Sequence, residues 1–414
     1  MVMIVDLADR LKRLGNRMQF KKKTHRLAQF AGRKASETMQ GTPRSRLPAL
    51  TSLRFFAAFH VLMFHSFVMQ GLDWAPAWLQ QFASIGYVAV SMFFVLSGFI
   101  LIYTYSGTDF NIGHFWRARL ARLYPVYLLS LALHGPLFFY AVLKTNDPYW
   151  GHFKTHLAST AILVLSMLQA WSPLAALGWN GVAWAVSVEF FFYLIFPVLL
   201  VRLARSSNSS LAALAISSWT VIVALDVVYV ILQPDHVPPS SNTDFLFWLN
   251  VVKFHPFMRL PEFIIGVTCG FWFVRGGLSS KLATPLVLTG TATSLILAAF
   301  SRYIPYPVMH TGLFAPAFAA IIYGLALRPR WTSFLEWRWL VLFGESSYCF
   351  YLLHAMVVGI VLFANPHAIS KPTPLRWLGG AITATMVGLL VYRFVEEPAR
   401  RWLRGKPKAT ATAS

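Results

Sequence analysis

Long apolar stretches, separated by short polar segments, dominate the chain from residue 50 to residue 395. Most of them run for roughly 18–24 residues, the length that an α-helix needs to cross a bilayer. Only helices or closed barrels satisfy the backbone hydrogen bonds of a segment in lipid. We therefore predict an all-α fold, a polytopic membrane helical bundle. Its ten predicted spans are 50–70, 85–106, 122–143, 182–201, 211–232, 257–274, 283–300, 311–327, 341–363 and 375–395.

One further apolar run, at residues 157–170, is of marginal length for a span. The loop charges decide its treatment, because cytoplasmic loops carry an excess of Lys and Arg. If the N-terminus is cytoplasmic, the basic loops after residue 170 lie on the cytoplasmic side only if the run 157–170 does not cross the membrane. These loops and the tail carry Arg202, Arg205, Arg275, Lys281, Arg328, Arg330, Arg338, Arg393, Arg400, Arg401 and Arg404. We predict that both termini are cytoplasmic and that 157–170 is a re-entrant or interfacial segment on the outer side.

Composition supports the membrane class: 57% of the 414 residues are hydrophobic, 12% are charged and the mean hydropathy is +0.56. A soluble domain carries about 25% charge. The net charge of +21 could indicate nucleic acid. Here the cations cluster in the N-terminal segment, the short loops and the tail, as the positive-inside rule requires, so we expect no nucleic-acid partner. Cys269 and Cys349 both lie in apolar runs, which indicates no disulfide framework.

Three segments are expected: a basic cytoplasmic N-terminal segment (1–48), a membrane domain (49–398) and a basic cytoplasmic tail (399–414). The first segment lacks the apolar core and cleavage site of a secretory signal peptide. Within it, residues 4–18 have the spacing of an amphipathic helix on an anionic lipid surface, and a disordered basic tail is an equal alternative. The longest outer loop, 233–256, could shape a substrate entrance.

Arg54 and His65 lie within the first predicted span. At about 100° and ~1.5 Å per residue they share one helix face and are about 16 Å apart along the axis. Ionisable groups inside a span are costly, and by default they indicate function. The predicted orientation places Arg54 near the cytoplasmic face and His65 in the outer half.

The same orientation assigns a depth to the other polar residues of the spans. Glu189 falls in the outer half with His65, because the fourth predicted span starts outside. By the same reasoning, Arg259 and Glu262 fall near the outer mouth, and His354 near mid-membrane. The residues predicted to contact an acceptor substrate are Trp184, Arg259, Glu262 and His354.

Arg117, Arg119 and Arg122 follow the second predicted span on the cytoplasmic side. Arg119 and Arg122 are three residues apart and share a face if helix begins there. Guanidinium groups bind phosphate through paired hydrogen bonds, so the cluster suits a phosphorylated cofactor. Alternatively, these arginines are ordinary positive-inside anchors, an interpretation that fits Arg117 best.

The chemistry that these residues suit is acyl transfer to a hydroxyl. That reaction needs a base for the hydroxyl proton and donors for the developing oxyanion. His65, supported by Glu189, suits the first role, and Arg54 or backbone amides suit the second. Alternatively, His65 is a packed core histidine, which is the usual case on an apolar helix face. His152 and His156 are four residues apart, but without an acidic third ligand they indicate no metal site.

Six motifs occur in order along residues 48–401. They are Leu53-Arg54 with His65 eleven residues after the arginine, Gly86–Phe99, Arg117–Pro125, Trp184–Tyr193, Ser347–His354 and Glu396-Glu397-Pro398. Together they resemble the integral-membrane acyltransferase-3 family, which O-acetylates bacterial surface and secreted sugars and some small molecules. One position departs from the family pattern: Phe190 replaces the usual second acidic residue, which puts a two-carboxylate mechanism in doubt.

The resemblance implies an acyl-CoA donor, usually acetyl-CoA, from the cytoplasm, and a carbohydrate or glycolipid acceptor such as an exopolysaccharide or lipopolysaccharide. It implies that His65 is the catalytic histidine, Arg54 its motif partner, and Arg119 and Arg122 the residues facing the nucleotide phosphates. It also implies no metal, a multi-pass location in the bacterial inner membrane and the stand-alone type without an esterase-like domain. The oligomeric state stays open. The alternative hypothesis is a secondary transporter with a pathway through His65, Glu189 and Glu262.

Overall fold

The computed structural model describes residues 44–70, 72–146, 148–236, 246–363 and 373–404. Contacts divide the chain into two units. The first comprises Met1–Ser45 and Tyr105–Phe110, and in it the rings of Tyr105 and Phe110 pack edge to face. The second comprises Arg46–Thr104 and Asn111–Ser414 and contains nearly the whole helical bundle. The predicted amphipathic helix at 4–18 lies outside the described residues.

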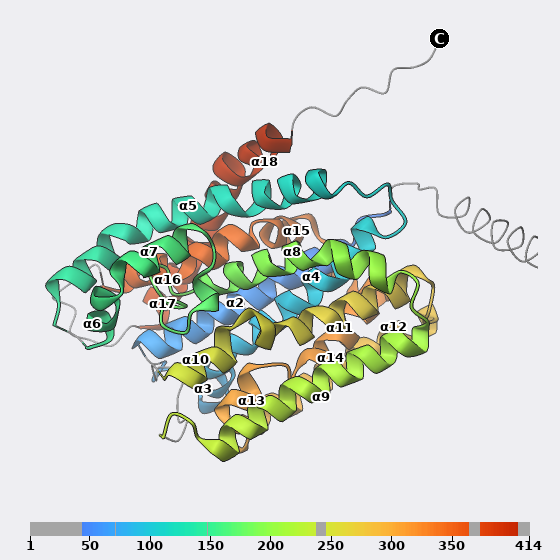
Figure 1. The fold of residues 1–414 in the computed structure, drawn as a ribbon, viewed down its shortest axis with the longest axis horizontal. Coiled ribbons are helices and arrows are strands. Elements are labelled where there is room, and N and C mark those ends of the chain that lie inside the picture. Colours follow the sequence, from blue (N-terminus) through green and yellow to red (C-terminus); the bar gives the residue numbers. More distant parts are fainter. Residues whose placement is uncertain (1–43, 71, 147, 237–245, 364–372, 405–414) are drawn as a thin grey trace, which may run out of the picture. The chain divides into compact units, whose positions relative to one another are not determined.

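The described residues form helices and turns (Figure 1). The α-helices are α2 (Pro48–Gln70), α3 (Ala77–Ser84), α4 (Ala89–Tyr105), α5 (Ile112–Lys144), α6 (Pro148–Thr155), α7 (Leu157–Leu165), α8 (Trp184–Leu203), α9 (Asn208–Leu232), α10 (Phe247–Phe254), α11 (Pro256–Val274), α12 (Ala283–Ala299), α13 (Tyr306–His310), α14 (Ala315–Ala326), α15 (Arg338–Glu345), α16 (Ser347–Phe363), α17 (Pro374–Val391) and α18 (Glu397–Arg404). A π-helical turn, Tyr392–Glu396, joins the last two.

The predicted all-α membrane bundle is confirmed. Within the described residues, nine helical segments are long and apolar enough to cross a membrane, and α15 with α16 forms a tenth if this pair, bent by 69°, is one span. The apolar windows of α9 and α12 are only 22% and 17% buried, so most of their side chains face outward. In a membrane that outward surface faces lipid, which explains its apolar character.

Residues 157–170 do not form a spanning helix. They form the nine-residue helix α7, followed by a short turn and a 3₁₀-helix at Gln169–Trp171. Nine helical residues rise only about 14 Å, less than half of a bilayer core. Which of the following loops lie on the cytoplasmic side of the membrane, and which on the outer side, stays a prediction.

Two predicted loops are partly helical. The arginine-bearing segment after the second span belongs to α5, which begins at Ile112 because the side chain of Asn111 accepts a hydrogen bond from the backbone N–H of His114 (2.8 Å). The predicted outer loop 233–256 contains α10, whose start is held by Asp235: its carboxylate accepts from the N–H groups of Trp248 and Leu249.

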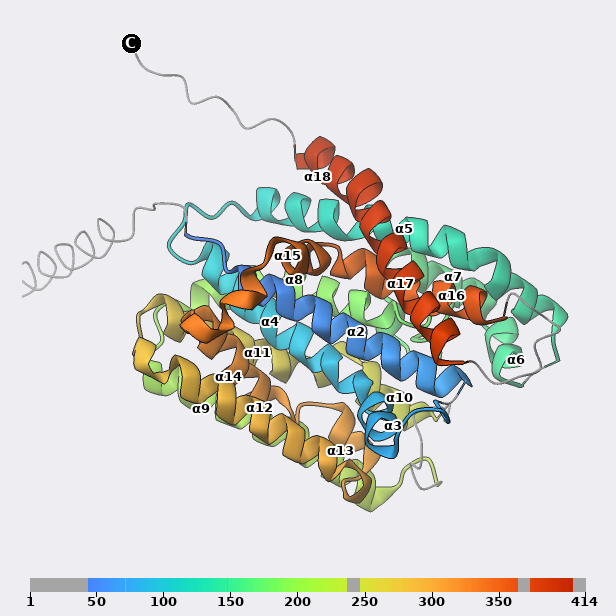
Figure 2. The same cartoon turned by 180° about the vertical axis from the view of Figure 1, so that it is seen from behind.

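The helices pack around α2 and α4, which run through the middle of the bundle (Figures 1 and 2). Helix α2 contacts α15 and α16, and α16 contacts α17 and α5. Helix α11 contacts α8, α9 and α14, which in turn contacts α12. Gly98 on α4 and Gly266 on α11 allow these two helices to touch, because a Cβ on Gly266 would lie 1.9 Å from the carbonyl oxygen of Val95.

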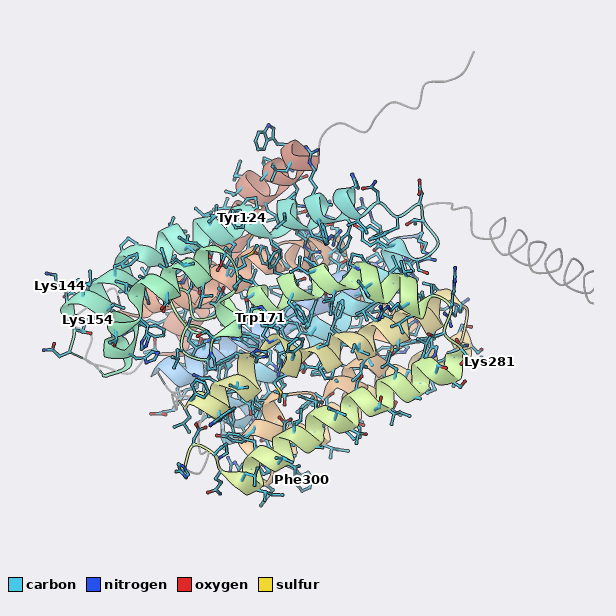
Figure 3. The ribbon with its side chains drawn as sticks, in the orientation of Figure 1. Tyr124, Lys144, Lys154, Trp171, Lys281 and Phe300 are labelled. Atoms are coloured by element: carbon cyan, nitrogen blue, oxygen red, sulfur yellow. The ribbon has the colours of Figure 1, made fainter. Side chains whose placement is uncertain are left out.

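Labelled residues identify the two ends of the helical bundle. Lys144 and Lys154 lie at one end and Lys281 at the other, where α12 begins (Figure 3). Phe300, directly after α12, lies far from Lys281 in the same view. The predicted orientation assigns the Lys281 end to the cytoplasm. The amino-terminal part of α5, with its arginines, lies at this same end (Figure 1).

Candidate functional site

A cavity lies between α2, α4, α5, α8 and α16. It holds about 760 Å³ of empty space, part of it open to solvent. Apolar side chains of α4 form one wall, and polar side chains from the other helices converge on it. The polar residues that line it, tyrosines included, are Arg54, Ser97, Arg119, Arg122, Glu189, Tyr193, Ser347, Tyr348 and Tyr351.

Arg119 and Arg122 reach the cavity from one face of α5, as their spacing predicts. The guanidinium carbon of Arg119 lies 5.7 Å from the ring centres of both Phe115 and Tyr193, which fixes the direction of its side chain. Arg117 points elsewhere: it is exposed, and its Nε donates to the backbone carbonyl of Leu403 on α18 (2.5 Å). The structure therefore separates Arg117 from the other two.

Arg54 on α2 joins the two α5 arginines in this cavity, and Glu189 on α8 is the acidic residue among them. The hydroxyl of Tyr193, one turn after Glu189, donates to its carboxylate. Arg54 and Arg122 both lie within electrostatic range of Glu189. Three guanidinium groups around one carboxylate leave a net positive charge in a confined, largely apolar space, and such a site attracts an anion.

His65 lies three turns further along α2, and it pairs with His354 of α16: Nε2 of His354 is 3.1 Å from Nδ1 of His65. Nδ1 of His354 is 2.7 Å from the carbonyl oxygen of Tyr351, and Nδ1 of His65 is 3.0 Å from that of Val61. Both carbonyls accept only, so in the neutral pair each Nδ1 carries a proton. His354 then accepts from His65, and Nε2 of His65 carries the lone pair of a base.

The sequence interpretation placed Glu189 beside His65. In the structure the partner of His65 is His354, and Glu189 is bonded to Tyr193 in the arginine cavity. Glu189 shares this cavity with Arg54, three turns of α2 away from His65, and not the level of His65 that the predicted span boundaries gave it. Tyr351 connects the two places, because it lines the cavity while its carbonyl holds His354.

Arg259 and Glu262 form a buried ion pair on α11, with Nε 3.1 Å from Oε2 and both side chains 0% exposed. Arg259 also donates to the carbonyl of His310 (2.8 Å) and to the hydroxyl of Ser91 (3.1 Å). Its guanidinium carbon lies 5.8 Å from the ring centre of Trp184. The structure thus brings together three of the four residues predicted to contact an acceptor, in a closed cluster beside the cavity wall.

Asp226 is a polar residue that the sequence interpretation missed. It is fully buried on α9, and the hydroxyl of Thr311 donates to its carboxylate. Its position inside an otherwise apolar span is the signal that could have revealed it. Tyr193 and Ser347 were also missed as cavity residues, although Tyr193 lies one helical turn after Glu189. In the described part of the chain, no group of three His, Cys, Asp or Glu side chains could hold a metal.

Comparison with known proteins gives the context of this site. A family model described as an acyltransferase domain matches residues 47–393. The chain is 30% identical to the acyltransferase MdmB of Streptomyces mycarofaciens, over 88% of this chain and 95% of MdmB. It is 28% identical to the putative peptidoglycan O-acetyltransferase YrhL of Bacillus subtilis and 23% identical to the O-acetyltransferase OatA of Staphylococcus aureus, in each case over 86% of this chain.

The chain covers 55% of YrhL and 57% of OatA, so it spans only a little over half of these two relatives. No solved structure matches it. The family model covers most of the chain, including Arg54, His65, the α5 arginines and His354. The chain therefore belongs to the acyltransferase-3 family of integral-membrane acyltransferases.

Proposed function

We propose that this acyltransferase moves an acyl group, in the first place acetyl, from acyl-CoA on the cytoplasmic side to a carbohydrate hydroxyl on the outer side of the membrane. One observation carries the proposal. An arginine-lined cavity and a histidine pair with a free base nitrogen lie along the same helix, α2, and share Tyr351 of α16.

The donor side rests on charge. Arg54, Arg119 and Arg122 converge on one cavity from two helices, and clustered guanidinium groups suit the phosphates of CoA. Arg54 and His65 are about 16 Å apart along the helix axis. If the phosphates of acyl-CoA contact the arginines, its extended pantetheine arm would carry the thioester along α2 toward His65.

The chemistry rests on the tautomers of the histidine pair. Nε2 of His65 takes the proton of the acceptor hydroxyl while the hydroxyl oxygen attacks the thioester carbonyl. The C–S bond then breaks, and the CoA thiolate leaves with the proton that His65 accepted. The products are an ester and free CoA. His354 is a positioning residue here, because its hydrogen bond, with that of the Val61 carbonyl, holds the proton on Nδ1 of His65 and leaves Nε2 as the base.

The acceptor is proposed by analogy with the relatives. YrhL is named for peptidoglycan, and OatA is named an O-acetyltransferase. A carbohydrate or glycolipid of the cell envelope, modified at the inner membrane of a bacterium, is the acceptor class that fits these names. Trp184, Arg259 and Glu262 are the residues proposed to form its site, which requires that their buried cluster open toward the acceptor.

The test compares the acyl content of envelope glycans, by mass spectrometry, in cells with and without the gene, together with product formation by the purified protein in detergent with radiolabelled acetyl-CoA. We expect gene-dependent esters and labelled product. A transporter would make no covalent product in detergent. Wild-type activity in a folded His65→Ala protein would overturn the mechanism.

A further inference from the structure

The predicted span at residues 341–363, the ninth along the chain, is broken inside the bundle, next to the arginine cavity. Helix α15 ends at Glu345, α16 begins at Ser347, and the two axes differ by 69°. Ser346 belongs to the end of α15: its N–H bonds to the carbonyl of Leu342, and its hydroxyl donates to the carbonyl of Phe343. The amino-terminal end of the 17-residue helix α16 therefore lies within the bundle.

Such a helix end favours an anion. The first N–H groups of an α-helix have no intrahelical acceptor, and they form the positive end of the helix dipole. In most spans these groups lie at the membrane surface, where water satisfies them. At a break inside a span they need a partner from the protein or from a ligand.

A second observation points to a ligand at this place. Ser347, the first residue of α16, is 1% exposed and lines the cavity. Its hydroxyl oxygen is buried and has no hydrogen-bond partner within the described part of the chain. Buried hydroxyls are almost always bonded, so one that lines a cavity without a partner indicates an absent acceptor.

The surrounding charges agree with this interpretation. The hydroxyl of Tyr348 donates to the carbonyl of Leu123 (2.8 Å), which ties the first turn of α16 to the turn of α5 that carries Arg122. Arg54, Arg119 and Arg122 line the same cavity, where they outnumber the single carboxylate of Glu189. The carboxylate of Glu396 also lies near this turn, 3.1 Å from the Cys349 sulfur, but Arg400 pairs with it (3.3 Å).

We propose that the first turn of α16, with the Ser347 hydroxyl and the guanidinium groups of Arg54 and Arg122, is a subsite for a phosphate group of the acyl donor. The identity of the donor rests on the proposed function. The subsite itself rests on the broken span and the unpartnered hydroxyl, and it adds a helix end and Ser347 to the arginines.

The test measures binding to the full-length protein in detergent by calorimetry, with CoA, pantetheine and inorganic pyrophosphate as separate probes. For Ser347→Ala we expect about tenfold weaker binding of CoA and of pyrophosphate, the loss of one hydrogen bond to a charged group. Pantetheine, which has no phosphate, should bind equally to both proteins. For Ser347→Asp, whose carboxylate repels phosphate, we expect a loss of about 100-fold or more.

Ser346→Ala is the matched control, because Ser346 is also buried but its hydroxyl donates to the backbone carbonyl of Phe343. It should bind all three probes like the wild type. Equal CoA binding by Ser347→Ala and the wild type, or an equal loss in Ser346→Ala, would overturn the subsite. If the wild type binds pyrophosphate in a Ser347-dependent way but not CoA, the subsite stands and the proposed donor fails. If it binds neither, both fail.

Discussion

Nε2 of His354 lies 3.1 Å from Nδ1 of His65, so two residues 289 positions apart in the sequence share a hydrogen bond between α16 and α2. The carbonyl of Tyr351 holds the other nitrogen of His354. These three groups form a chain of hydrogen bonds that determines which nitrogen of each ring carries a proton. His65 is the last group in this chain, and its second nitrogen is available for a substrate.

Replacing His65 by Ala or Gln should lower the rate constant of acyl transfer at saturating donor by about 100-fold or more, because the base for the hydroxyl proton is lost. CoA binding should stay the same, since the arginine cavity is intact. The measurement is single-turnover transfer from acetyl-CoA together with calorimetric binding. His156→Ala, at an exposed residue outside both the cavity and the histidine pair, is the control and should keep wild-type activity.

Replacing His354 by Ala should lower the same rate constant by about tenfold, the effect of losing one orienting hydrogen bond. Because His354 acts through His65, the double variant His65→Ala/His354→Ala should be no slower than His65→Ala alone. The check is a double-mutant cycle on the transfer rate. Additive losses in the cycle would mean that His354 acts independently, as an acceptor-binding residue would.

Replacing Arg119 or Arg122 by Ala should weaken CoA binding by about 10- to 100-fold, because each substitution removes a charged hydrogen-bond donor from the cavity. Arg117→Ala should bind CoA like the wild type, since this exposed side chain bonds to Leu403 instead. The measurement is the dissociation constant of CoA for the three variants. A loss in Arg117→Ala as large as in the other two would contradict the assignment of the cavity.

Replacing Arg259 alone by Met should destabilise the protein by about 3–5 kcal/mol, because it leaves the buried carboxylate of Glu262 without its partner. The double variant Arg259→Met/Glu262→Leu should recover much of this loss, since the ion pair is then removed as a whole. Thermal unfolding in detergent compares the two. If the single variant is as stable as the wild type, the pair is not closed from solvent and has space for a ligand.

The sequence predicted the helical membrane architecture well, because long apolar stretches leave few alternatives in a bilayer. It predicted the convergence of Arg119 and Arg122 from their spacing, once Asn111 starts a helix ahead of them. It also singled out the residues that the structure brings together in pairs, such as Arg259 with Glu262. Spacing within one helix is local information, and a sequence carries it directly.

The sequence did not predict which helices face each other. Glu189 and His65 were expected to pair because both fall in the same predicted half of the membrane. In the structure Glu189 bonds to Tyr193 in the cavity of Arg54, which lies three turns from His65 along α2. The partner of His65 came from α16, and the bend that begins α16 at Ser347 has no proline to mark it. Such contacts depend on packing between distant segments, which hydropathy does not encode.

The contact of Gly98 with α11 has a consequence for how the protein moves. Helix α4 forms a wall of the donor cavity, and α11 carries Arg259 and Glu262. Because their backbones touch at Gly98 and Gly266, neither helix has room to slide without the other. A widening of the cavity that moves α4 should therefore displace the buried ion pair with it, so that donor entry and exposure of the proposed acceptor residues become one motion.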